Sequence, residues 1–331
     1  MSETKTVAAP ELRPLGALPK GLAWLALLGT LGLMFLGGLV TTRDAGMAVP
    51  DYPLSFGRLN PPGWWQLEEV ALEHSHRLVA ATVGIVIILL TAAIWRGTRE
   101  RVVRSLALAA LGLVIVQGLL GGLRVIFNSL DLAIVHGILA HGFFSLLLLL
   151  AIYVTWGNPR RDEAREIPAF VVWVFVASVF LQLIVAAVMR HLKAGMAIPD
   201  FPLAFGMLWP PIETFPVMIA YTHRLLGYTI AVALLLFTGW KWLFGKPGVE
   251  RTYVTALFIL VIFQIALGAR VLLGGRQAME VSTHLIVAAA ILGLSVAWAT
   301  RYCRIPAVAG AKTRLMKVRS TGQRPSVEGM A

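Results

Sequence analysis

The stretch AGMAVPDYPLSFG (residues 45–57) is written a second time as AGMAIPDFPLAFG (residues 194–206). Ten of the thirteen positions are identical, and the three exchanges keep size and polarity nearly constant, so chance is a poor explanation. Glycine and proline at fixed positions favour a compact, ordered turn over a random linker. The stretch therefore predicts two copies of one structural unit, each with a loop that either covers helix ends or contacts a ligand.

Shorter matches follow this loop in the same order in both parts of the chain. The pairs are EHSHRLVAATVG (73–84) with AYTHRLLGYTIA (220–231), QGLLGGLRV (117–125) with QIALGARV (264–271), and AIVHGILAH (133–141) with VSTHLIVAA (281–289). Each half holds four apolar segments, and an even number of spans returns the chain to its starting side of a membrane. We therefore predict a parallel repeat, with halves related by an axis near the membrane normal.

The composition is that of a membrane protein. Hydrophobic residues make up 58% of the 331-residue chain and charged residues only 14%. Eight stretches are long and apolar enough to cross a hydrocarbon core, which takes about 20 helical residues. They lie near residues 21–42, 70–94, 103–123, 131–154, 168–190, 216–240, 252–273 and 281–301. The predicted fold is an all-α integral membrane protein with eight transmembrane helices in two four-helix bundles.

The basic residues predict which side of the membrane the chain ends occupy. Most of the 29 Lys and Arg residues fall on one side if both termini are cytoplasmic. The net charge of +12 is therefore interpreted as a signal for topology and anionic lipid, and not for nucleic acid. The predicted parts are an N-terminal tail (1–20), an N-terminal half (21–154), a cytoplasmic linker (155–167), a C-terminal half (168–301) and a basic cytoplasmic tail (302–331).

The repeat divides the seven histidines into matched and unmatched ones. His76 matches His223, and His136 matches His284, on the second and fourth spans of each half. All four fall in the early turns of spans that enter from the outer face. The unmatched ones are His74, His141 and His191, which stand opposite Tyr221, Ala289 and Thr42.

The matched histidines are candidate metal ligands. Ionisable side chains inside a membrane are costly and usually functional, and imidazole is a common ligand of metals and of haem iron. Two histidines on facing helices of a bundle can hold a flat macrocycle between them. A tetrahedral zinc site would lack ligands, because no matched carboxylate or thiolate lies near either pair. We therefore predict two haem-binding sites, both towards the outer face.

The two halves differ in one carboxylate. Glu73 precedes His76 by three residues and lies on the same helix face, whereas the matching position in the second half is Ala220. A carboxylate beside only one of two pockets marks that pocket as the candidate reaction site. The alternative is that Glu73 pairs with an arginine near the membrane surface. Candidate partners for haem propionates are Arg77, Arg124, Arg224 and Arg270, for which anchoring of helix ends is an equal alternative.

Taken together, these residues resemble one known family. ExxHR at residues 73–77, VHGILA at 135–140, THR at 222–224, THLIVA at 283–288 and RHLKAGMAIPDFP at 190–202 resemble the haem A synthases of the Cox15/CtaA family. The resemblance covers residues 20–302. Many bacterial members have a cysteine pair in an outer loop, which this chain lacks because Cys303 is its only cysteine.

The resemblance implies a reaction and a role for each site. Members oxidise the C8 methyl group of haem O to a formyl group, through hydroxylation and loss of water, to give haem A for terminal oxidases. By resemblance, Glu73 is the catalytic residue, His76 and His136 hold the substrate haem O, and His223 and His284 hold haem b. Whether one histidine of the N-terminal pair leaves during the reaction stays open.

The resemblance also implies partners and a place in the cell. The chain is expected in the inner (plasma) membrane of a bacterium, with haem O synthase and an unidentified electron-transfer protein as candidate partners. The main alternative is a non-enzymatic membrane electron carrier with two b haems. A secondary transporter and a haem chaperone are further alternatives, although a transporter would place its polar residues at the midplane.

Overall fold

The computed structural model of the chain describes residues 13–157 and 166–302. Within these residues, eight helices are long and apolar enough to cross a membrane, which confirms the predicted spans and the all-α class. They are α1 (Ala17–Thr42), α2 (Glu68–Gly97), α3 (Arg101–Ile126), α4 (Leu130–Trp156), α5 (Ala169–His191), α6 (Phe215–Leu243), α7 (Val249–Leu273) and α8 (Ala278–Thr300). Most of the predicted tails, 1–20 and 302–331, and of the predicted linker, 155–167, lies outside the described residues.

The helices extend a few residues beyond the predicted spans, because polar residues continue them past the apolar segments. Glu68 and Glu69 open α2, where carboxylates interact favourably with the N-terminal end of the helix dipole. Ser129 caps α4, its hydroxyl accepting the N–H of Leu132 at 3.3 Å. Hydropathy thus locates the spans but not their ends.

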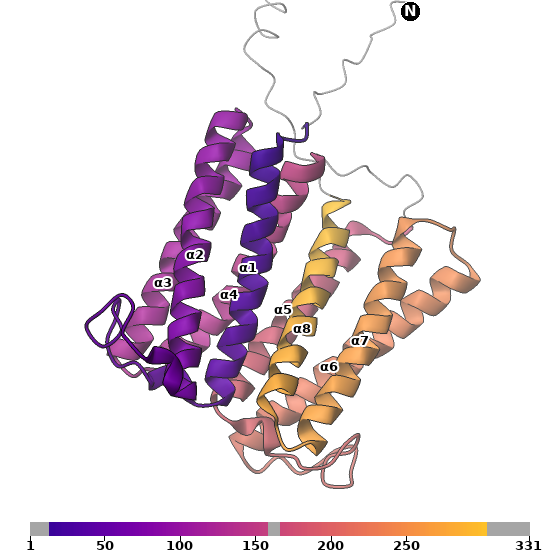
Figure 1. Cartoon of the computed structure of the whole chain (residues 1–331). Helices are drawn as coiled ribbons and strands as arrows, with labels where there is room; N and C mark the ends of the chain where they lie inside the picture. Colours follow the sequence, from indigo (N-terminus) through magenta and orange to yellow (C-terminus); the bar gives the residue numbers. More distant parts are fainter. Residues whose placement is uncertain (1–12, 158–165, 303–331) are drawn as a thin grey trace, which may run out of the picture.

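Helices α1–α4 and α5–α8 form two neighbouring groups (Figure 1). The halves meet where α1 packs on α8 and where α4 packs on both α5 and α8. Both repeated loops lie at the end of the molecule opposite the start of α1 (Figure 1), and each begins with a short 3-10 helix, η1 (Ala45–Met47) or η3 (Ala194–Met196). A third one, η2 (Trp64–Gln66), precedes α2.

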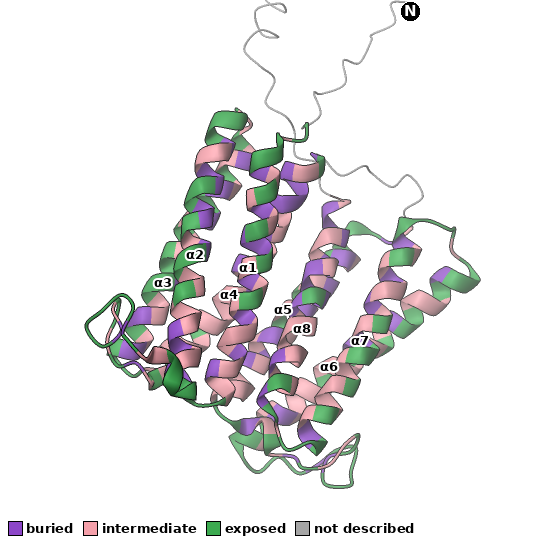
Figure 2. Ribbon diagram, in the orientation of Figure 1, coloured by how far each residue is buried: buried purple, intermediate pink, exposed green. Residues whose placement is uncertain are grey.

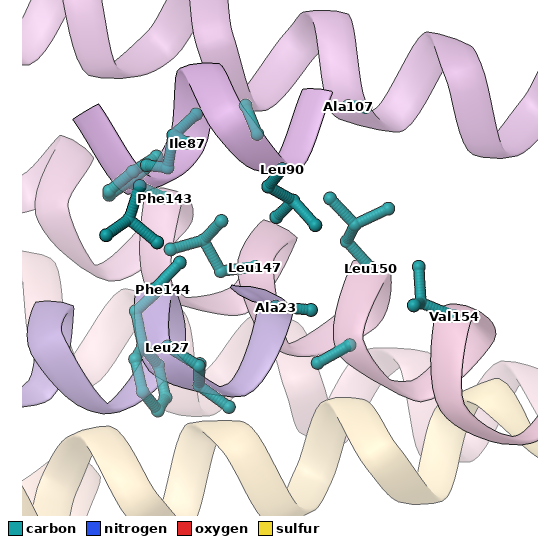
Figure 3. Close-up of a cluster of buried hydrophobic side chains, with 14 of the residues drawn as sticks. Ala23, Leu27, Ile87, Leu90, Ala107, Phe143, Phe144, Leu147, Leu150 and Val154 are labelled. Atoms are coloured by element: carbon teal, nitrogen blue, oxygen red, sulfur yellow. The ribbon is translucent and has the colours of Figure 1, made fainter. Parts of the chain in front are cut away.

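Each half has its own apolar core. In the N-terminal half, Ile87, Leu147 and Leu150 are almost fully buried (Figure 3). In the C-terminal half, Leu234 and Leu257 belong to a second buried cluster. Figure 2 shows exposed residues along the outer faces of the helices, and many of these are large and apolar. Such faces suit lipid, so close packing between the helices is what stabilises the bundle.

The two repeated loops have the same internal hydrogen bonds. Asp51 accepts the backbone N–H groups of Phe56 and Gly57, each at 2.8 Å, and Asp200 accepts the matching pair at 2.7 and 2.8 Å. The N–H of Gly57 holds the pKa of Asp51 below its ordinary value of 3.8, and the pKa of Asp200 is lowered in the same way. Each copy is therefore a compact turn built around an ionised carboxylate.

In each loop, one arginine of the helix that follows forms hydrogen bonds with the loop backbone. The Nη atoms of Arg77 donate to the carbonyl oxygens of Asp51, Leu54 and Val49 at 2.6, 2.8 and 2.8 Å. Arg224 makes the matching three bonds in the second loop at 2.6, 2.9 and 2.8 Å. A planar guanidinium can satisfy three carbonyls at once, which a lysine ammonium in the same place cannot match in geometry.

Replacing either arginine is expected to open its own loop and not the other. Arg77→Leu leaves three loop carbonyls without their donor, at a cost of about 1–3 kcal/mol for each one that stays buried. Limited proteolysis should then cut within residues 45–57 of that variant, and within residues 194–206 of Arg224→Leu. Each variant is the control for the other, and equal cleavage of both loops in either one would contradict the assignment.

Equivalent positions of the repeat meet between the halves. Asp44 and Lys193 both directly precede the AGMA tetrapeptide, and both have a φ of 55°. Their side chains form an ion pair of 2.9 Å. Because both are exposed, the pair contributes about 0–1 kcal/mol. An axis between the halves would bring equivalent positions together, so the contact supports the parallel repeat, which stays a prediction, as does the cytoplasmic side of the termini.

A buried charge cluster joins the ends of three segments on the side opposite the loops. Lys241 of α6 is 1% exposed and lies 2.7 Å from Glu166, just before α5, and 2.9 Å from Glu250 in the first turn of α7. Glu250 also accepts the hydroxyl of Tyr302 and the backbone N–H of Glu166. The cluster therefore holds the segment just before α5, where the C-terminal half begins, against the ends of α6 and α7.

Lys241→Met is expected to lower the free energy of unfolding by about 3 kcal/mol, because it leaves the buried Glu250 carboxylate without its cation. Thermal unfolding in detergent measures this, with exposed Lys193→Met as the control.

Lys241 also lowers the pKa of Glu166 from its ordinary 4.5. A lowered carboxyl pKa stabilises the fold above the ordinary value and is lost as the pH falls through the folded value. Wild type should therefore lose more stability below about pH 4.5 than the variant, and parallel losses would contradict this.

Candidate functional site

The C-terminal half contains a cavity between two facing histidines. His223 of α6 and His284 of α8 line it, and their ring centroids lie 6.4 Å apart with the ring planes at 63°. The cavity measures about 250 Å³ and is lined mostly by apolar side chains, among them Val179, Leu183 and Val261. The structure thus brings the predicted C-terminal pair together.

Neighbouring residues contact both of these histidines. Gln182 of α5 donates to the backbone oxygen of His223 at 2.8 Å, and its Nε2 lies 3.1 Å from Nδ1 of the same histidine. Gln264 of α7 donates to the backbone oxygen of His284 at 2.9 Å. A Cβ on Gly268 would lie 3.1 Å from Cε1 of His284, so a larger residue there would require the ring to shift by a few tenths of an ångström. Nδ1 of His284 is buried and has no partner within the described residues.

The spacing of the rings fits one metal ion between them. A bond from a metal to an imidazole nitrogen is about 2 Å, so two such bonds and the two half-rings span about 6 Å, close to the observed 6.4 Å. Within residues 13–157 and 166–302, no group of three or more His, Cys, Asp or Glu side chains could hold a metal ion. Two histidines in an apolar cavity therefore fit haem iron, whose remaining four ligands come from the macrocycle.

The N-terminal half repeats the arrangement with the second predicted pair. His76 of α2 and His136 of α4 each lie against a glycine of a neighbouring helix. Nε2 of His76 lies 3.3 Å from the position of a Cβ on Gly37, and Cε1 of His136 lies 3.4 Å from that of Gly121. Gln117 donates to the backbone oxygen of His136 at 3.2 Å, as Gln264 does for the C-terminal pair. Nδ1 of His136 is also buried and without a partner among the described residues.

Glu73 lies between the N-terminal site and the first loop. Its side chain is 2% exposed, with Oε1 2.8 Å from Nη2 of Arg77 and Oε2 accepting the N–H of Val49 at 3.3 Å. This is the pairing with arginine that the sequence left open as an alternative. Yet Arg224 fastens the second loop with the same three bonds although Ala220 stands in place of the glutamate. The loop architecture therefore does not require the carboxylate.

The four arginines that the sequence offered as propionate contacts lie in different places. Arg77 and Arg224 are tied to loop carbonyls, although Arg224 also lines the cavity. Arg124 lies against the first loop, where a Cβ on Gly46 would be 2.7 Å from its Nη1, and it interacts electrostatically with Glu73. Arg270 is 72% exposed and bonds to Glu280 at 2.8 Å. Their contact with propionates stays a prediction, and Arg270 is the least well placed for it.

A difference in register explains the position of Arg270. Gly121 and Gly268 pack against equivalent histidines, and they lie 147 residues apart. This offset matches Arg124 with Val271, whereas the sequence comparison matched it with Arg270 across a one-residue gap. One residue turns a helix by about 100°, which points Arg270 away from the face that Arg124 occupies.

Three cavity residues are missing from the sequence-based site, and a fourth, His141, lies outside the two matched histidine pairs. Gln182, His141, Arg190 and Arg276 all line the C-terminal cavity. Nδ1 of His141 lies 2.9 Å from the carbonyl oxygen of Gly137, so it must carry the proton, and Nε2 is left as a buried acceptor without a partner among the described residues. His74, by contrast, is a structural residue: its Nδ1 bonds to Oγ of Ser55 at 2.9 Å.

The fold and this site define a polytopic membrane protein with a histidine-lined cavity in a helical bundle. Residues 65–296 match the family COX15-CtaA, described as cytochrome oxidase assembly protein, and the chain belongs to this family. Its relatives include proteins named heme A synthase. Those of Shouchella clausii and Halalkalibacterium halodurans are 31% and 28% identical over 271 and 270 residues, which cover 77% and 78% of this chain and 87% and 89% of the relatives. That of an Exiguobacterium species is 28% identical over 290 residues, with 83% and 91% covered.

Proposed function

We propose that the chain is a haem A synthase, which oxidises the C8 methyl group of haem O to a formyl group. The family and the names of its relatives support this reaction. The observation that carries the proposal is the difference between two otherwise matched histidine sites. The buried carboxylate of Glu73 lies one helical turn from His76, whereas Ala220 holds the matching position beside His223, and the second loop folds without a carboxylate there.

The two sites have different roles in this proposal. His223 and His284 hold haem b as the resident cofactor, and His76 and His136 hold haem O as the substrate. Bound haem b supplies an iron that can exchange single electrons. Gln182 contacts the ring of His223, Gln264 bonds to the backbone of His284, and the apolar lining of the cavity excludes water.

Glu73 is placed to handle protons at the substrate site. Its Oε1 is held by Arg77 and its Oε2 by the backbone of the first loop, so the carboxylate is immobilised one helical turn from His76. A fixed carboxylate in a water-poor site can accept protons released when a methyl group is oxidised.

The setting and the partners follow from this reaction. Eight apolar helices and bacterial relatives indicate a multi-pass bacterial membrane protein. Haem O is itself a membrane molecule, so delivery by haem O synthase within the plane of the membrane is part of the proposal. The proposal also includes an electron-transfer partner and a location of both sites near the outer face of the membrane.

The test is to identify the haems that the purified chain contains. The chain is expressed in cells that supply haem O, and its haems are extracted and identified by mass and by pyridine haemochrome spectra. Haem A or its hydroxylated precursor together with haem b is the expected result. Only haem b, with haem O shown to be available, would contradict the synthase and favour the dihaem electron carrier.

A further inference from the structure

Two arginines at the loop end of the C-terminal cavity have no role in the site described so far. Arg190 is the penultimate residue of α5, and Arg276 lies in the turn between α7 and α8. Nε and Nη1 of Arg190 are buried and have no hydrogen-bond partner in the part of the chain that the structure describes. The charged neighbour of Arg190 is Arg276, a second cation. Two neighbouring cations beside an apolar cavity favour an anion there, because a buried unpaired charge is strongly unfavourable.

The other cations around the cavity already have partners. Lys193 forms its ion pair with Asp44 at 2.9 Å. Arg224 donates to three loop carbonyls, and Arg270 bonds to Glu280 outside the cavity. An anion in the cavity would therefore meet Arg190 and Arg276 first.

The backbone at Arg276 points to a role for its side chain. Its φ is 62°, in the left-handed region that side chains with a Cβ rarely adopt. The matching residue of the N-terminal half is Asn128, with a φ of 46°, and asparagine tolerates this conformation better. An arginine held at such a position against its backbone preference is typical of a residue kept for its side chain.

The guanidinium of Arg190 lies against the other half of the molecule. The position of a Cβ on Gly137 of α4 is 3.5 Å from Nη2 of Arg190, which is an ordinary contact distance. The repeat places Leu285 opposite Gly137. In the N-terminal half the position of Arg190 is held by Thr41, whose hydroxyl bonds to the backbone oxygen of Gly37 at 2.8 Å. The N-terminal half therefore has no arginine at the position of Arg190.

We propose that Arg190 and Arg276 form a carboxylate clamp for the macrocycle held by His223 and His284. The clamp rests on the proposed function, because it requires a haem in this cavity. A guanidinium can form two parallel N–H···O bonds with one carboxylate, and a haem carries two carboxylate side chains. The histidines then fix the iron, and the clamp fixes which edge of the macrocycle faces α5 and the turn between α7 and α8.

The test compares haem b with its dimethyl ester, in which both carboxylates are blocked. The full-length chain is purified with little haem and titrated with each compound, and the dissociation constants are read from the Soret band. Wild type is expected to bind haem b about tenfold to a hundredfold more tightly than the ester. Arg190→Gln and Arg276→Gln should each bring this ratio towards one by weakening the binding of haem b, and Arg190→Lys should restore part of it.

Arg270→Gln is the matched control, because it removes the same charge from the same half but outside the cavity. It should keep the wild-type ratio. Unchanged ratios in both Arg190→Gln and Arg276→Gln, with both compounds still bound through histidine, would overturn the clamp and leave the proposed function intact. A wild-type chain that binds neither compound through histidine would instead contradict the proposed function itself.

Discussion

Glu73→Gln is expected to stop haem A formation while the protein keeps its fold and its resident haem. General acid–base groups contribute about 10²–10⁴-fold to rate, so haem A and its hydroxylated precursor should fall at least about a hundredfold, and haem O should remain in the purified protein. Glutamine keeps the shape of the side chain and can still accept the N–H of Val49, but it cannot take up a proton or pair with Arg77 as an anion.

The repeat supplies a second variant that separates chemistry from structure. Glu73→Ala recreates the C-terminal arrangement, in which Ala220 stands beside Arg224 and the loop keeps its three bonds. This variant should therefore resist proteolysis in residues 45–57 as well as wild type does, and should also fail to make haem A. Glu69→Gln, at an exposed position one turn earlier on α2, is the control. Normal haem A formation by Glu73→Gln would remove Glu73 from the catalytic role.

The sequence predicted the parts of the molecule that occur twice. Apolar length located all eight helices, and the repeat selected His223 and His284, whose rings face each other across the cavity. Both signals are strong because they are physical requirements: a span must be long and apolar, and a macrocycle between two helices needs a ligand from each.

Residues that occur once were harder to predict. Comparing the halves discards Arg190, Arg276, His141 and Gln182, since their counterparts have different chemistry, yet all four line the cavity. Arg190 at a helix end is indistinguishable in sequence from an arginine that anchors a span at the membrane surface. Its guanidinium lies against Gly137 in the other half, which is a tertiary contact that no local pattern reports.

The register of α7 relative to its counterpart α3 could not be determined from the sequence. The glycines of QGLLGGLRV and QIALGARV can be aligned with or without a gap, and the gap brings Arg124 opposite Arg270. Only the contacts of Gly121 and Gly268 with equivalent histidine rings fix the offset. A one-residue shift in the alignment changes the sequence similarity only slightly. On a helix, however, the same shift moves a side chain from one face to another.

His284→Ala is expected to remove the resident haem, whereas His136→Ala should leave it in place. Loss of an outer partner of a metal ligand costs about 10–100-fold in affinity, so loss of a ligand itself should cost more, and haem b should no longer co-purify with His284→Ala. His136 belongs to the other half, on α4, and its removal should instead prevent retention of haem O. The measurement is the haem-to-protein ratio of each purified variant, with separate quantification of haem b and haem O.

His74→Gln is the control for these two variants, because His74 is a buried histidine that bonds to Ser55 and belongs to neither matched pair. It should retain both haems. Loss of haem b from His284→Ala and loss of haem O from His136→Ala would show that the two sites bind different haems. A general defect in folding would instead lower the content of both haems together. Loss of haem b from His136→Ala with haem O retained would reverse the assignment of the sites. This result would place the substrate in the C-terminal cavity, away from Glu73, so the proposed catalytic role of Glu73 would be wrong.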